Sequence, residues 1–272
     1  MAQQTTRLTH GDLAWREAGT GSPMLLLHGI GAGSASWVGQ LQALSAAWHV
    51  MAWDAPGYGG SAPLADSAPL AADYAAVLED FVRMRKLGPI VLVGHSLGAL
   101  MAAAVAARAE VAMSALVLVS PALGYGKAAA GLRERKWRER IEMVDRLGIA
   151  GMAEQRSAAL CAPGASAASV QTVRDNMARA TAGGYKQAAH LLAHDDLLTH
   201  LLRVRVPTAV LCGALDTITP PLACKAMAEA VQAPYTELTG VAHACYVEDP
   251  AQFNAALLRI LSGMRARSES NV

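Results

Sequence analysis

The stretch IVLVGHSLGAL at residues 90–100 limits the possible folds of this chain more than any other. Four apolar residues lead into Gly94, a lone Ser96 stands between two glycines, and an Ala-rich helical run follows at once. A G-x-S-x-G sequence between a strand and a helix predicts a sharp, strained turn that needs glycine two residues before and two after the serine. Such a turn exposes the hydroxyl and aims the first helical N–H groups at it. Ser96 is therefore a candidate nucleophile.

The apolar runs of strand length are nearly continuous and do not alternate with polar residues. This pattern is typical of parallel strands buried on both faces of a sheet. Segments with helical spacing lie between these runs, as in Tyr74, Leu78 and Phe81. We expect that helix to stop at Gly88-Pro89. Asp249-Pro250 is predicted to begin a final helix. The order predicts an α/β fold with a doubly wound, mostly parallel sheet. The strand-like runs are MLLLH at 24–28, HVMAW at 49–53, IVLVG at 90–94, ALVLVS at 115–120 and TAVLCG at 208–213.

The alternation of strands and helices stops between Pro121 and Val206. No strand-like run occurs there, and segments such as LRERKWRERIEMVDRLG have helical patterns. We therefore expect a helical cap formed by residues 121–206, inserted into a core formed by residues 1–120 and 207–272.

Five segments occur in an order that resembles the α/β-hydrolase superfamily, and more narrowly its small bacterial members with a helical cap. They are HGIGAG, WDAPGYGGS, GHSLG, GALDTITP and VAHACYVEDPAQFN, and the resemblance extends from about Leu13 to Met264. It implies eight strands, with the second antiparallel and the cap inserted after the sixth. Asp54, in the second segment, is expected to brace the structure near the turn.

The resemblance also implies a catalytic triad, because in this superfamily the nucleophile is followed along the chain by an acid and then by a histidine. Asp216 directly follows an apolar strand, and His243 is the only histidine after it. The segment VSPALGYG, after the preceding strand, offers no alternative carboxylate. We predict that His243 accepts the proton of Ser96 while Asp216 holds the imidazole in the correct tautomer.

An attack by Ser96 on a carbonyl creates an oxyanion that needs preformed hydrogen-bond donors. The backbone N–H groups of Leu97, next to the nucleophile, and Ile30, in the loop after the first apolar run, are the predicted donors. The glycines around Ile30 have neither dinucleotide-binding spacing nor a phosphate-loop lysine. Candidate pocket residues are mostly apolar, which favours acyl chains or uncharged rings. They are Trp37, Leu97, Tyr125, Ile218 and Tyr246.

A serine nucleophile disfavours the branches of this superfamily that use aspartate, the haloalkane dehalogenases and epoxide hydrolases. We expect hydrolysis of a small carboxylic ester or lactone through an acyl-enzyme on Ser96. A perhydrolase, an acyltransferase and a non-catalytic small-molecule receptor remain alternatives, since one fold supports many functions.

The main alternative is a carbon–carbon bond hydrolase acting on a vinylogous diketone from aromatic ring cleavage. Similar enzymes usually have Asn before the nucleophile and Trp after the catalytic histidine, where this chain has His95 and Ala244. They also use a cap arginine to bind the substrate carboxylate. Three arginines of the predicted cap are candidates, and the sequence does not choose among Arg156, Arg174 and Arg179.

Composition limits the partners and the compartment. A net charge of +1 provides no general attraction for nucleic acid or an anionic membrane. The first residues lack the basic and apolar regions of a signal peptide, and the four cysteines form no CxxC pair. We therefore expect a cytoplasmic protein, monomeric or homodimeric, that acts on a small molecule and needs no cofactor or metal.

Overall fold

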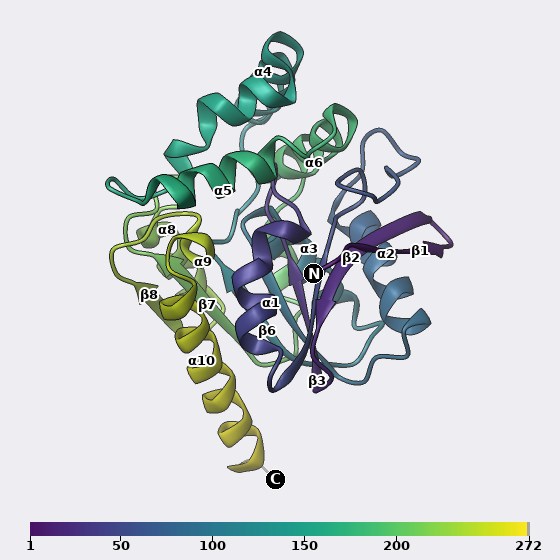
Figure 1. The fold of residues 1–272 in the computed structure, drawn as a ribbon, viewed down its shortest axis with the longest axis vertical. Helices are drawn as coiled ribbons and strands as arrows, with labels where there is room; N and C mark the ends of the chain where they lie inside the picture. Colours follow the sequence, from purple (N-terminus) through teal and green to yellow (C-terminus); the bar gives the residue numbers. More distant parts are fainter. Residues whose placement is uncertain (271–272) are drawn as a thin grey trace.

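A computed structural model describes residues 1–270 of the chain (Figure 1). Its strands form one eight-stranded sheet in the order β1-β2-β4-β3-β5-β6-β7-β8. β2 is antiparallel to both β1 and β4, and the pairings from β4 to β8 are parallel. The mostly parallel sheet with an antiparallel second strand is thus confirmed. The strands are β1 (Gln4–Leu8), β2 (Gly11–Ala18), β3 (Ser22–Leu27), β4 (Trp48–Trp53), β5 (Ile90–His95), β6 (Met113–Val119), β7 (Thr208–Gly213) and β8 (Tyr235–Leu238).

Helices cover both faces of the sheet because successive side chains of each strand point to opposite faces. In β3, Leu25 and Leu27 pack into one core cluster, while Met24 and Leu26 pack into the other. The first cluster contains side chains of α2, α3 and α8, and the second contains those of α1 and α10. These helices are α1 (Val38–Leu44), α2 (Ala71–Met84), α3 (Leu97–Arg108), α8 (Pro221–Ala230) and α10 (Pro250–Ser270); the 3-10 helix η1 (Ser34–Trp37) precedes α1, and the short α9 (Cys245–Glu248) precedes α10.

The chain between β6 and β7 is helical and contains no strand among the described residues. Figure 1 shows α4, α5 and α6 together above the sheet, at the end of the molecule opposite the C-terminal part of α10. α4 is broken at Gly148, whose φ of 64° is left-handed. We call residues 121–206 the helical insertion. Its helices are α4 (Ala130–Arg156), η2 (Ala158–Leu160), α5 (Ala167–Met177), α6 (Ala182–His194) and α7 (Leu197–Leu201).

The observed ends of two helices can be compared with the ends that the sequence predicted. α10 begins at Pro250 as predicted, and Asp249 Oδ1 accepts the Gln252 N–H at 2.9 Å, as expected for an N-cap. α2 ends at Met84, before the predicted stop at Gly88-Pro89, because Lys86 adopts a left-handed φ of 52°. Within residues 1–270, no helix combines the length and apolarity that a bilayer crossing requires.

Candidate active site

Ser96 lies at the turn between β5 and α3, with φ 53° and ψ −117°. This is a strained conformation for a residue with a side chain. A Cβ placed on Gly94 would lie 2.7 Å from the Cα of Ala99, so Gly94 is needed where the chain folds back on itself. The same Cβ would overlap the Gly98 carbonyl oxygen, so the two glycines crowd each other at the turn. Gly98 must also be a glycine because it faces the end of β3. Its Cβ would lie 2.5 Å from the Leu27 carbonyl oxygen, where α3 crosses the end of β3.

Asp216 and His243 form a buried hydrogen-bonded pair at the carboxyl end of the sheet. His243 Nδ1–H donates to Asp216 Oδ2 at 2.9 Å. The other carboxylate oxygen, Oδ1, accepts the backbone N–H groups of Ile218 and Thr219 at 2.8 and 2.9 Å. Burial alone raises the pKa of Asp216, but its hydrogen bonds with His243 and Thr219 outweigh burial and lower that pKa to about 2. Asp216 is therefore ionised and fixes the imidazole orientation.

Thr219 contacts both members of this pair, although the sequence analysis did not select it. Its hydroxyl lies 2.8 Å from Asp216 Oδ2, 3.0 Å from the Ser120 carbonyl oxygen and 3.2 Å from His243 Nδ1. The D-x-x-T spacing in LDTIT was the only indication in the sequence, and a threonine three residues after an aspartate is commonly just a turn residue.

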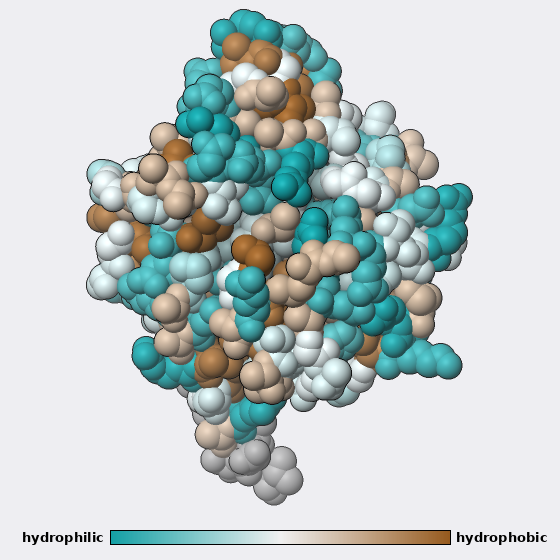
Figure 2. All heavy atoms as spheres, viewed as in Figure 1, coloured by the Kyte–Doolittle hydropathy of each residue, from teal (hydrophilic) through white to brown (hydrophobic). Residues whose placement is uncertain are grey.

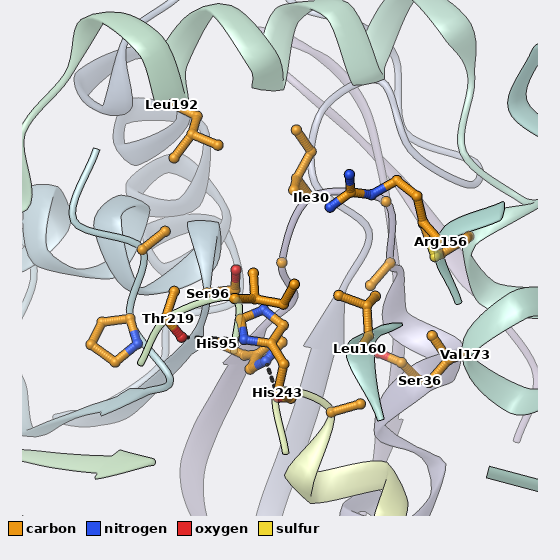
Figure 3. Close-up of a pocket in the computed structure, with 18 of the residues that line it drawn as sticks. Ile30, Ser36, His95, Ser96, Arg156, Leu160, Val173, Leu192, Thr219 and His243 are labelled. Carbon is orange, nitrogen blue, oxygen red and sulfur yellow. Dashed lines mark hydrogen bonds between the residues drawn. The ribbon is translucent and has the colours of Figure 1, made fainter. Parts of the chain in front are cut away.

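Ser96 and His243 line the same cavity, and Figure 3 draws both side chains beside it. No hydrogen bond joins their side chains among the described residues. Catalytic hydrogen bonds are often long without substrate and tighten in the reactive complex. The arrangement thus brings the three predicted residues to one place, with the Asp216–His243 half of the relay already formed.

His95, the residue before Ser96, holds the backbone of the catalytic loop. Its Nε2 lies 2.9 Å from the His243 carbonyl oxygen, and its ring centroid is 4.7 Å from that of His243. Burial, together with the charge of His243, lowers the pKa of His95 to about 3. His95 is therefore neutral and donates its Nε2 proton to that carbonyl, which makes it a support for His243.

The loop after β3 packs directly against Ser96. A Cβ on Gly29 would lie 2.8 Å from the Cβ of Ser96, so only glycine allows this approach. The next residue, Ile30, lines the cavity. Neither the Ile30 N–H nor the Leu97 N–H donates to another group among residues 1–270, so both remain open for a ligand oxygen.

The cavity has a volume of about 310 Å³, which is enough for a small molecule. Of the predicted wall residues, Tyr125, Ile218 and Tyr246 line it. Trp37 does not; it is fully buried behind the wall, stacked on Tyr246 with ring centroids 4.0 Å apart. Its place in the wall is taken by Ser36, whose Oγ accepts the Tyr246 hydroxyl at 3.1 Å. The side chain of Leu97 was also predicted to line the pocket, but it is buried and absent from the wall; its other predicted role concerns the backbone N–H.

Two arginines of the helical insertion line the cavity, and no acidic residue does. Arg156, at the end of α4, points toward the cavity in Figure 3 and has no ion pair with a described carboxylate. Arg140 lies over the ring of Tyr125 at 5.9 Å and was not selected from the sequence. Of the other two arginines considered, Arg174 pairs with Glu154 at 3.2 Å and, like Arg179, does not line the cavity.

Asp54 is buried beside the Ser34 loop. Its carboxylate accepts the Ser34 N–H at 2.7 Å and the Gln3 side-chain amide at 2.5 Å. It does not line the cavity, and its contacts hold the loops after β3 and β4 together, in line with the expected brace.

Comparison with known proteins identifies the family of this chain. The model of the family described as "Alpha/beta hydrolase family" matches residues 24–256. The chain belongs to this family. The α/β-hydrolase fold predicted from the five segments is thereby confirmed. The structure places the helical insertion between β6 and β7.

Individual relatives are hydrolases of several kinds. The chain is 36% identical to the (E)-2-((N-methylformamido)methylene)succinate hydrolase of Acinetobacter baylyi over 101 residues, which are 37% of this chain and 38% of that protein. It is 24% identical to 3-oxoadipate enol-lactonase 2 of the same organism, over 93% of this chain and 95% of the relative. A thermophilic esterase from Thermogutta terrifontis superposes with a TM-score of 0.86 at 25% identity, over 97% of this chain and 99% of the esterase.

Proposed function

We propose that this protein is a serine hydrolase that cleaves a small carboxylic ester or lactone through an acyl-enzyme on Ser96. The observation that supports this most is the buried 2.9 Å bond between His243 and Asp216, beside a serine on a strained strand–helix turn. A histidine oriented by an ionised aspartate is the base that a serine hydroxyl needs.

The proposed reaction has two halves. Ser96 Oγ attacks the ester carbonyl carbon while His243 takes the hydroxyl proton, and the N–H groups of Ile30 and Leu97 stabilise the resulting oxyanion. The carbon–oxygen bond of the leaving group then breaks, and His243 returns the proton to the departing alcohol. A water molecule, deprotonated by His243, attacks the acyl-enzyme and releases the acid and Ser96. Asp216 stays ionised throughout and stabilises the imidazolium.

The test is turnover of 4-nitrophenyl acetate and 4-nitrophenyl butyrate by the wild type and by Ser96→Ala. We expect the alanine variant to lose at least about 10³-fold in kcat, because the nucleophile is gone while the pocket remains. A residual rate close to that of the wild type would rule out an acyl-enzyme on Ser96. Binding without turnover in the wild type would instead indicate a receptor.

The arginines of the insertion narrow the substrate class. A guanidinium that lines a cavity without a carboxylate partner favours an anionic ligand. The sequence analysis favoured acyl chains or uncharged rings. With Arg156 in the cavity, we propose instead that the substrate is an ester or lactone with a carboxylate that Arg156 binds. The succinate and oxoadipate in the names of the two relatives fit a substrate of this kind.

Arg156→Gln tests the proposed anion preference. We expect kcat/KM for a monomethyl ester of a short dicarboxylic acid to fall about 10- to 100-fold, the equivalent of one charge-assisted hydrogen-bonded contact. The rate with a neutral ester of the same length should change little. Arg174→Gln is the matched control, because Arg174 lies in the same insertion but pairs with Glu154 outside the cavity. Equal losses on both esters would contradict the assignment.

Carbon–carbon bond hydrolysis is the second candidate, and the position of Arg156 in the cavity favours it. The residue before the nucleophile and the residue after the base argue against it. Carbon–carbon bond hydrolases usually have Asn and Trp at these positions, where this chain has His95 and Ala244. Turnover of a ring-cleavage diketone faster than that of any ester in a panel would decide for this candidate.

A further inference from the structure

The loop that contains His243 is fixed by a carboxylate that the proposed reaction does not use. Glu248, at the end of α9, accepts the Ala242 N–H with Oε1 at 2.9 Å, so it holds the residue directly before the catalytic histidine. The carboxylate has no ion pair with any described cation. Instead, it accepts hydrogen bonds from backbone N–H groups.

The second oxygen of the same carboxylate reaches the helical insertion. Glu248 Oε2 accepts the Ala162 N–H at 2.6 Å, from the segment between η2 and α5. Two residues earlier, the Leu160 carbonyl oxygen accepts the Ala244 N–H at 2.8 Å, just after the catalytic histidine. Leu160 also lines the cavity. The insertion is therefore bonded directly to Ala244, after His243, and through the Glu248 carboxylate to Ala242, before it.

Together with the bond from His95 to the His243 carbonyl, three consecutive residues of this loop are held by hydrogen bonds from other segments. We propose that Glu248 is a positioning residue for His243, which makes the catalytic geometry depend on the docking of segment 158–162 of the insertion. This inference rests on the proposed function, because it concerns the base of that reaction. A misplacement of about 1 Å at such a base costs about 100-fold in rate.

Glu248→Gln is the test, since glutamine has the same shape but only one acceptor oxygen. Its amide NH₂ would face one of the two backbone N–H groups, so one of the bonds is lost. We expect kcat for 4-nitrophenyl acetate to fall at least about 10-fold with KM changed less than about 3-fold. The matched control is Asp249→Asn, which makes the same chemical change at the adjacent N-cap of α10. Because asparagine caps a helix N-terminus about as well as aspartate, this variant should keep its stability and a kcat within about 2-fold of the wild type.

A readout independent of substrate is the downfield proton NMR signal of His243 Nδ1–H, bonded to Asp216. We expect it to shift or broaden in Glu248→Gln and to stay in place in Asp249→Asn. A folded Glu248→Gln protein with kcat within about 2-fold of the wild type would overturn the proposal. A lower kcat with an unmoved imidazole signal would also overturn it, because the loss would then arise outside the catalytic loop.

If Glu248→Gln does not fold, Glu248→Asp replaces it under the same criteria, since its shorter side chain cannot span both amides. The proposed function fails separately: if Ser96→Ala retains the wild-type rate, the reaction does not use Ser96, whatever Glu248→Gln does. If Ser96→Ala is inactive and Glu248→Gln is fully active, only the role of Glu248 is refuted.

Discussion

At the scale of single residues, the proposed site depends on the hydrogen bonds that Asp216, the charged partner of His243, accepts. Asp216 is buried and needs its acceptor capacity filled to stay ionised. The backbone N–H groups of Ile218 and Thr219 donate hydrogen bonds to one carboxylate oxygen. His243 and the Thr219 hydroxyl donate to the other. Thr219 donates through its side chain, as His243 does, and Cys212 Sγ adds only a weak contact at 4.0 Å, so the contribution of Thr219 is open to substitution.

Thr219→Val removes the hydroxyl and keeps the shape of the side chain. We expect kcat on 4-nitrophenyl acetate to fall about 3- to 10-fold, the effect of one hydrogen bond of about 0.5–1.5 kcal/mol. Thr208→Val is the control, because its hydroxyl bonds the Val206 carbonyl at the start of β7, away from the cavity. If both variants reduce kcat to the same extent, the Thr219 hydroxyl has no specific role in orienting the pair.

At the scale of elements, the placement of the helical insertion depends on a close backbone contact. Gly184 in α6 meets Gly57, in the loop after β4, so closely that a Cβ on Gly184 would overlap the Gly57 carbonyl. Thr181, the N-cap of α6, also donates its hydroxyl to the Gly57 carbonyl oxygen at 2.7 Å. The contact thus joins the insertion to the core at a second place, in addition to its bonds with the loop of His243.

Adjacent glycines allow a matched test of this contact. Gly184→Ala should destabilise the protein by about 1–3 kcal/mol, because the added methyl group has no space. Gly183→Ala should be neutral or slightly stabilising, since nothing lies within 4 Å of its position and alanine favours a helix. Urea unfolding of both variants measures the difference. Similar free energies of unfolding would show that α6 is not packed on Gly57 in solution.

At the scale of the whole molecule, stability should depend on pH through Asp216. Its pKa of about 2 in the folded protein lies below the ordinary value of 3.8, so ionised Asp216 stabilises the fold at neutral pH. This contribution is lost as pH falls from about 5 through 2, by about 2 kcal/mol. Unfolding free energies measured over this range should fall more steeply for the wild type than for Asp216→Asn. Parallel curves would mean that Asp216 has an ordinary pKa.

The sequence predicted what local patterns determine. Continuous apolar runs marked five of the strands, because strands buried on both faces need such side chains, and G-x-S-x-G located Ser96 at its turn. The first two strands and the last were not located, since their pattern is partly polar and exposed. Glu248 was missed because one of its partners, Ala162, lies far along the chain. Arg140 was missed because helical spacing does not show which face of α4 lies over the cavity. Trp37 was placed in the wall because spacing does not show which way a ring points.

The most direct test of the central claim is covalent trapping of the nucleophile. After incubation with diisopropyl fluorophosphate, peptide mapping by mass spectrometry should find one phosphoryl adduct, on Ser96. The same reaction should be at least about 100-fold slower in His243→Gln, because the base that activates the hydroxyl is absent. An unmodified Ser96, or equal labelling rates in the wild type and in His243→Gln, would contradict a serine activated by His243.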